Sequence, residues 1–108
     1  MMKKNTTKAA TKTTKTWYEG RDTGNPVTVL ALVKKKIYEG DKVTKWCLEL
    51  ASFNSNTSKY RRSWIVALDF DKFNIKEGDV IACNLTIVTN SNNDKMTTEF
   101  ILNDVEVD

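Results

Sequence analysis

The feature that most restricts the fold is a series of β-branched and aromatic runs, each about ten residues long, beyond residue 17. None of these runs repeats its apolar residues with the 3.6-residue period of a helix. Turn-forming residues separate the runs, as in Gly24-Asn25-Pro26, Glu39-Gly40-Asp41 and Lys76-Glu77-Gly78-Asp79, where glycine supplies the positive φ of a turn. The pattern predicts an all-β protein.

Five strands are expected, and their lengths indicate a barrel. The predicted ranges are 27–38, 42–53, 60–70, 79–89 and 95–107. These strands are longer than the five or six residues of a typical strand, and a small closed barrel needs long, bent strands. Only residues 71–77 separate the third strand from the fourth. The helix that an OB-type barrel can have between these two strands is therefore lost or reduced to a turn. We therefore predict a five-stranded Greek-key barrel of the OB-fold type, with little or no helix.

Alternation within the predicted strands indicates which side chains face the core. The apolar faces are Ile81, Cys83, Leu85 and Ile87 in the fourth strand and Trp46, Leu48 and Leu50 in the second. The first strand is apolar on both faces from Val27 to Val33, as expected for a strand that bends across a barrel or lies in an oligomer interface. This pattern favours a homo-oligomer, a dimer or a tetramer.

Charge is distributed unevenly along the chain. The net charge is +3, yet residues 1–16 contain five lysines, no acid and almost nothing apolar, which predicts a flexible basic arm before an OB-fold domain of residues 17–108. Within the domain, residues 34–62 have a net charge of +5 and residues 63–108 a net charge of −6. A polyanion would be attracted to the first of these stretches and repelled by the second.

Several classes of protein are not expected. No apolar run is longer than Val29 to Val33, which is far shorter than the roughly 20 residues that cross a bilayer, and the N-terminus lacks the apolar block of a signal peptide, so we expect a cytoplasmic protein without membrane contact. Histidine is absent, and the only cysteines are Cys47 and Cys83, which excludes the usual zinc spacings. We expect both to be buried free thiols, with a single disulfide between them as the alternative.

Asp69-Phe70-Asp71 is typical of a turn, so we expect no enzymatic activity, no metal and no cofactor.

Two clusters combine cations with aromatic rings, the combination that binds single-stranded nucleic acid. Bases stack on flat side chains while cations follow the phosphate backbone. The first cluster is Lys59, Tyr60, Arg61, Arg62 and Trp64, at the third strand of the predicted barrel, and the second is Lys34, Lys35, Lys36 and Tyr38, where the first strand leads into its hairpin. Lys45, Trp46 and Phe53 complete the set of candidate binding residues.

The two tryptophans in this set have alternative roles. Trp64 either stacks on bases or continues a core stripe with Val66, Leu68 and Phe70. Trp46 lies on the apolar face of its strand, where core packing is the default and stacking is the alternative. For the lysine run of the second cluster, the alternative is ordinary solvated surface.

The last third of the chain resembles the bacterial single-stranded DNA-binding protein family. The matching segments are the turn Ile75-Lys76-Glu77-Gly78-Asp79-Val80, the strand Leu85-Thr86-Ile87, the hairpin from Thr89 to Lys95, and Thr98-Glu99-Phe100-Ile101-Leu102-Asn103-Asp104-Val105. The resemblance implies an OB fold over about residues 27–107 and single-stranded DNA as the ligand. The chain differs from the family pattern in its Thr-rich basic arm and in the missing helix. It also ends at Val105-Glu106-Val107-Asp108 without an aromatic tip, so recruitment of partner proteins through such a tip is not expected.

These observations favour largely sequence-independent binding of single-stranded DNA, in replication, recombination or DNA transfer. Stacking on aromatic rings does not distinguish DNA from RNA, because only contacts to the 2′-hydroxyl do so, and an RNA-binding OB protein is the first alternative. The acidic stretch 63–108 leaves a second alternative open, a protein-interaction barrel without a nucleic-acid role.

Overall fold

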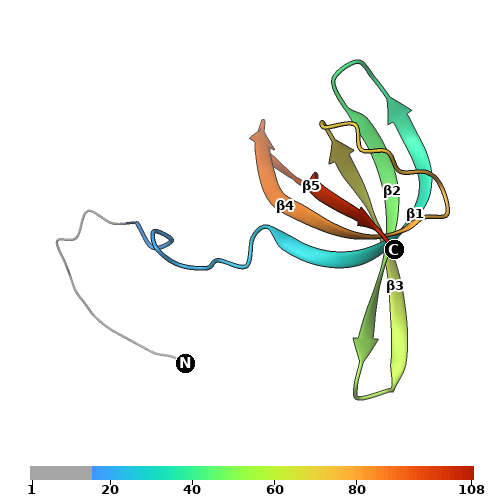
Figure 1. Ribbon diagram of the computed structural model, residues 1–108. Coiled ribbons are helices and arrows are strands. Elements are labelled where there is room, and N and C mark those ends of the chain that lie inside the picture. The colour runs from blue at the N-terminus through green and yellow to red at the C-terminus, as the bar shows by residue number, and fades with distance from the viewer. Residues whose placement is uncertain (1–15) are drawn as a thin grey trace.

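The computed structural model describes residues 16–108, and its five strands lie close to the predicted ranges. The strands are β1 (Val27–Glu39), β2 (Thr44–Asn54), β3 (Lys59–Asp69), β4 (Val80–Asn92) and β5 (Lys95–Val107) (Figure 1). No boundary differs from its prediction by more than three residues, and β5 matches throughout. Residues 16–108 contain no helix, and hence none long and apolar enough to cross a membrane. The predicted basic arm lies outside the described residues, apart from Thr16.

The strands close into a barrel in the order β1-β2-β3-β5-β4, with β4 pairing back onto β1. All neighbouring strands are antiparallel except β3 and β5, which run parallel through the pairs Ala67↔Phe100 and Leu68↔Ile101. The predicted all-β, five-stranded, OB-like barrel is confirmed.

One strand, β1, takes part in both halves of the barrel. Its residues Val27–Leu32 pair with β4, and its residues Leu32–Glu39 pair with β2. Two register shifts interrupt the pairing with β2, the first of them between Val33 and Lys35. Irregularities of this kind bend a strand and increase its twist, which a small barrel needs in order to close. The curvature of β1 is visible in Figure 1.

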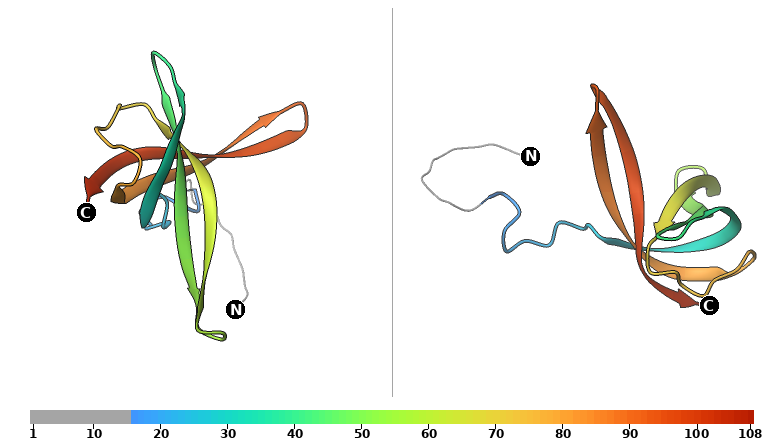
Figure 2. Two further views of the ribbon diagram at one scale, coloured as in Figure 1. Left: turned by 90° about the vertical axis from the view of Figure 1, so that its right-hand side faces the viewer. Right: turned by 90° about the horizontal axis from the view of Figure 1, so that it is seen from above.

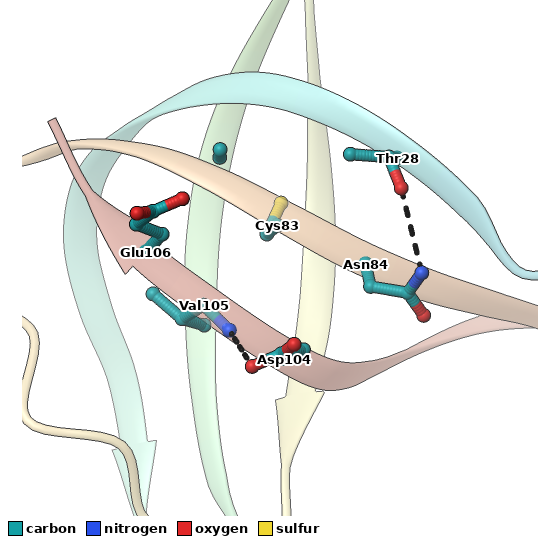
Figure 3. Close-up of a pocket in the computed structure, with 7 residues that line it drawn as sticks. Thr28, Cys83, Asn84, Asp104, Val105 and Glu106 are labelled. Atoms are coloured by element: carbon teal, nitrogen blue, oxygen red, sulfur yellow. Dashed lines mark hydrogen bonds between the residues drawn. The ribbon is translucent and has the colours of Figure 1, made fainter.

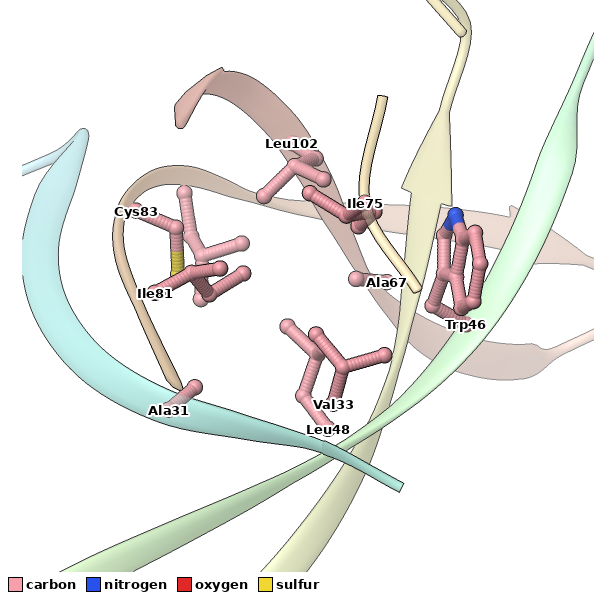
Figure 4. Close-up of a cluster of buried hydrophobic side chains, with 10 residues drawn as sticks. Ala31, Val33, Trp46, Leu48, Ala67, Ile75, Ile81, Cys83 and Leu102 are labelled. Carbon is pink, nitrogen blue, oxygen red and sulfur yellow. The ribbon is translucent and has the colours of Figure 1, made fainter. Parts of the chain in front are cut away.

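Inward-facing side chains from all five strands and the β3–β4 loop fill the interior. They are Ala31, Val33, Trp46, Leu48, Ala67, Ile75, Ile81, Cys83, Leu85 and Leu102 (Figure 4). The predicted inward faces of β2 and β4 are confirmed as far as the edge of the barrel, where Leu50 is half-buried and Ile87 is exposed. The outer side of β1 is open, since Leu30 is 66% exposed, so the double apolar pattern of β1 does not reflect cover by its own chain on both sides.

The loop between β3 and β4 closes one end of the barrel in place of a helix. Asp69, the last residue of β3, is fully buried, and its Oδ2 accepts a hydrogen bond from the backbone N of Phe73 (3.0 Å). Lys72 donates hydrogen bonds to Thr44 Oγ1 (3.0 Å) and to Gly40 O, which attach the loop to the β1–β2 hairpin. Asp69 is therefore a structural acceptor where the chain turns out of the barrel.

The β2–β3 and β4–β5 hairpins project beyond the barrel (Figure 2). β2 pairs with β3 along its whole length, and β4 pairs with β5 as far as Asn92↔Lys95. The fourth strand was predicted to end at residue 89, but β4 continues to Asn92 and only Asn93 and Asp94 form the hairpin turn, with φ of 52° and 67°. Asn and Asp tolerate this left-handed region better than other non-glycine residues, so two of them in succession make a tight two-residue turn.

Both cysteines are free thiols. Cys83 is buried in the core, and burial raises the pKa of its thiol to about 11. Cys47 is only half-buried because it lies on the outward side of β2. The prediction of buried free thiols is therefore right in full for Cys83 and only in part for Cys47.

Candidate nucleic-acid interface

The outward-facing residues of β1, β2 and β3 form one continuous surface, which we call the outer face. It consists of Leu32, Lys34, Lys35, Tyr38, Lys45, Cys47, Glu49, Ala51, Phe53, Tyr60, Arg62, Trp64, Val66 and Leu68. Successive side chains of a strand point to opposite sides, so the buried residues Leu48 and Ala67 identify the inward rows and leave these rows outside. Most of the candidate binding residues lie on it, namely Lys34, Lys35, Tyr38, Lys45, Phe53, Tyr60, Arg62 and Trp64.

Trp64 lies on the outer face, so the core alternative considered for it is wrong. Its side chain is 60% exposed, and Val66 in the same row is also exposed. The inward row of β3 contains Ile65 and Ala67 instead. Ala67 is the cross-strand partner of Trp46, so a small side chain lies beside the large indole in the core.

Trp46 is buried, with 4% of its side chain exposed, so the core alternative is the one that holds for it. Its Nε1 has no hydrogen-bond partner within residues 16–108. Lys36, which pairs with Trp46 across the strands, places its Nζ 5.3 Å from the centroid of the indole. These two candidate residues are therefore at the inward side of the sheet and not on the outer face.

The centre of the outer face contains a contact across three strands. Trp64 Nε1 on β3 donates a hydrogen bond to Glu49 Oε1 on β2 (3.0 Å), and Lys34 Nζ on β1 lies 3.7 Å from the same oxygen. The indole is thus held at its Nε1 edge while Trp64 as a whole remains 60% exposed. The candidate set omits Glu49, although its alternation with Lys45 and Phe53 along the strand already assigned it to their side.

At the projecting end of the β2–β3 hairpin, Phe53 and Tyr60 form a cross-strand aromatic pair. Their ring centroids are 5.0 Å apart with an interplanar angle of 58°. Phe53 is 55% exposed and Tyr60 is 73% exposed, so neither ring is part of the core. The pair offers flat apolar surface at the far end of the outer face.

At the other end of the outer face, Tyr38 and Lys45 are neighbours on β1 and β2. Lys45 Nζ lies 5.6 Å from the centroid of the Tyr38 ring, a cation–π distance. The ring of Tyr38 lies against Gly40, where a Cβ would come within 2.7 Å of it. Glycine at this position therefore leaves the space that the ring occupies.

The two adjacent arginines of β3 lie on opposite sides of the hairpin. Arg62 pairs with Ala51 on the outer face, whereas Arg61 and Lys59 lie in the other row, with Arg61 opposite Ser52. Beyond the barrel both rows are exposed to solvent. The structure therefore brings Arg62 together with the aromatic rings and separates Arg61 and Lys59 from them.

The β4–β5 side of the barrel is acidic. Asp104 and Glu106 of β5 line a pocket of about 160 Å³ together with Asn84 of β4 and Thr28 of β1 (Figure 3). Asn84 Nδ2 donates a hydrogen bond to Thr28 Oγ1 (3.4 Å), which links the two strands at the rim. Within residues 16–108 no group of three or more Cys, Asp and Glu side chains is arranged to hold a metal ion.

No family model, curated protein or solved structure matches this chain. The resemblance to the bacterial single-stranded DNA-binding protein family therefore stays a prediction.

Proposed function

We propose that this chain binds single-stranded nucleic acid, and DNA in particular, on the outer face of β1, β2 and β3. The exposure of the aromatic rings on this face supports the proposal most strongly. Tyr38, Phe53, Tyr60 and Trp64 are each more than half exposed, on a surface formed by three adjacent strands. Apolar surface that gathers in one place on a soluble domain is typical of a binding site.

The chemistry of the outer face suits unpaired bases. An exposed ring can stack on any unpaired base, with about 1–3 kcal/mol per base and little dependence on sequence. The faces of bases in a duplex are already stacked on one another and cannot use these rings. We therefore expect binding to be specific for single strands and largely independent of sequence.

The positive charges on the outer face also support the proposal that nucleic acid binds there. Lys35, Lys45 and Arg62 lie among the rings, where they can neutralise phosphates and release counterions, while Lys34 balances the charge of Glu49. The β4–β5 side, with Asp104 and Glu106, would repel a polyanion. The bound nucleic-acid strand is therefore expected to lie along the outer face and not to wrap around the barrel.

The wider proposal is a role in replication, recombination or DNA transfer, as a divergent member of the bacterial single-stranded DNA-binding protein family. It rests on the segments over residues 75–105 that resemble that family. Self-association through the open side of β1, where Leu30 is exposed, belongs to the same proposal.

The test is fluorescence anisotropy of the full chain with labelled oligo(dT), an oligo(U) of equal length and a DNA duplex, over a range of salt concentrations. We expect oligo(dT) to bind more tightly than the duplex, with log K falling against log salt by about 0.7 for each phosphate neutralised. Equal affinity for single strand and duplex would contradict the proposal. No binding at low salt would also contradict it and would favour the protein-interaction alternative. Tighter binding of oligo(U) would assign the chain to RNA.

A further inference from the structure

Glu49 is the only acidic residue among the outer-face residues that the structure describes. It lies at the centre of that face, opposite Trp64 on one side and Leu32 on the other, and its side chain is 15% exposed. A carboxylate in the middle of a surface that binds a polyanion is unfavourable unless a neighbouring cation offsets its charge or it contributes a contact to the ligand. The contacts of Glu49 indicate how it can act on the ligand.

The contacts of Glu49 hold its carboxylate beside the indole of Trp64. Oε1 accepts the hydrogen bond from Trp64 Nε1 (3.0 Å) and lies 3.7 Å from Lys34 Nζ. Lys34 offsets the negative charge, so that phosphates are not repelled from the centre of the face. Because both contacts involve Oε1, Oε2 is left as an acceptor. A base that stacks on the exposed indole with its polar edge turned toward Glu49 can donate a hydrogen bond to this acceptor.

The bases of DNA differ in what they offer to such an acceptor. Cytosine, adenine and guanine each have an exocyclic amine that donates hydrogen bonds, whereas thymine has carbonyl oxygens at its edge with a single N–H between them. Carboxylate side chains that read DNA sequence accept from the cytosine amine in this way. The carbonyl oxygens of thymine would instead face a carboxylate that cannot donate.

We propose that Glu49 makes one position of the bound strand selective, so that the nucleotide stacked on Trp64 preferentially has an exocyclic amine and thymine is disfavoured there. This inference rests on the proposed function, because it assigns a base preference to the same surface. Stacking on the other rings of the outer face remains tolerant of sequence. The protein would then bind mixed-sequence single strands more tightly than oligo(dT) of the same length.

The direct test compares the full chain on oligo(dT) with the same oligonucleotide containing one central cytosine. Cytosine is the suitable probe because both bases are pyrimidines with similar stacking area, so the comparison isolates the edge of the base. We expect the cytosine-containing strand to bind roughly fivefold more tightly or better, the lower end of what a hydrogen-bonded base contact discriminates.

The variant Glu49→Gln tests the role of the carboxylate. Its amide oxygen can still accept from Trp64 Nε1, but the amide nitrogen then replaces Oε2 with a donor, which matches the carbonyl oxygens of thymine. We expect the preference for cytosine to disappear or reverse. Glu106→Gln is the matched control, because it changes the net charge equally but lies on the β4–β5 side, and it should leave the preference intact.

The outcomes separate this inference from the proposed function. No binding of either oligonucleotide would contradict the proposed function itself. Tight binding of both with equal affinity would overturn the role of Glu49 alone, and this comparison uses the wild-type chain, so it does not depend on the folding of a variant. A cytosine preference that persists in Glu49→Gln would overturn it as well.

Discussion

The side chain of Asn25 forms two hydrogen bonds with the backbone of Ile87, from Asn25 Nδ2 to Ile87 O and from Ile87 N to Asn25 Oδ1, each 2.9 Å long. The pairing of β1 with β4 ends at Val27↔Leu85, two residues short of this contact on each strand. A side-chain amide presents a donor and an acceptor together, as a peptide group does. Asn25 therefore extends the β1–β4 pairing by one step beyond the end of β1.

Replacing Asn25 by Ala should lower the free energy of unfolding by about 1–2 kcal/mol, because two partly solvent-exposed hydrogen bonds are lost. Chemical denaturation measures this directly. Asn56→Ala, in the exposed turn between β2 and β3, is the control and should change the value by no more than about 0.5 kcal/mol. Equal effects of the two variants would show that the contact with Ile87 adds nothing to stability.

Stability should fall at alkaline pH because of Cys83. Burial raises the pKa of its thiol from the ordinary 9.0 to about 11. As the pH rises from about 9 to about 11, the unfolded chain releases this proton while the folded chain retains it, which favours unfolding by roughly 2–3 kcal/mol in total. The free energy of unfolding should therefore decline more steeply with pH in the wild type than in Cys83→Ala. Parallel profiles of the two proteins would refute this.

The two arginines of β3 should differ in their effect on binding. Arg62 shares the outer face with the aromatic rings, so Arg62→Ala should weaken binding to oligo(dT) and reduce the salt slope by about 0.7. Arg61→Ala removes the same charge from the neighbouring residue on the other side of the hairpin, and it should have a clearly smaller effect. Anisotropy titrations at several salt concentrations measure both quantities. If the two variants lose the same affinity and the same salt slope, the bound DNA strand does not lie along the outer face.

The two tryptophans of the barrel should separate stability from binding. Trp46 fills the core, so Trp46→Ala should lower the free energy of unfolding by about 3–5 kcal/mol. Trp64 is exposed, so Trp64→Ala should cost less than about 1 kcal/mol of stability but about 1–3 kcal/mol of single-strand affinity. Denaturation and anisotropy on the same preparations test this. Unchanged affinity in Trp64→Ala would exclude its indole as a base platform.

Features that depend on neighbours in the chain could be predicted from the sequence. The turn at Gly78 and the alternation of Ile81, Cys83 and Leu85 follow from local chemistry and from the two-residue period of a strand. The hairpin between Thr89 and Lys95 was expected, but the continuation of β4 to Asn92 was missed, because a run of polar residues is typical of both a loop and the end of a paired strand. In the structure, β4 pairs with β5 as far as Asn92↔Lys95, so residues 90–92 belong to the strand.

By itself, the sequence determined the number of strands, their approximate ends, and the inward rows of β2 and β4. Only the tertiary structure decided which row of β3 faces the core, because both rows contain apolar residues and it is the pairing with β2 that places Ala67 inward, opposite Trp46. That choice places Trp64 and Arg62 on the outer face and Arg61 in the other row, since exchanging the two rows of a strand reverses every side chain in it. Bringing Trp64, Glu49 and Lys34 together likewise required pairing across three strands, which is a contact between distant parts of the chain and leaves no local pattern in the sequence.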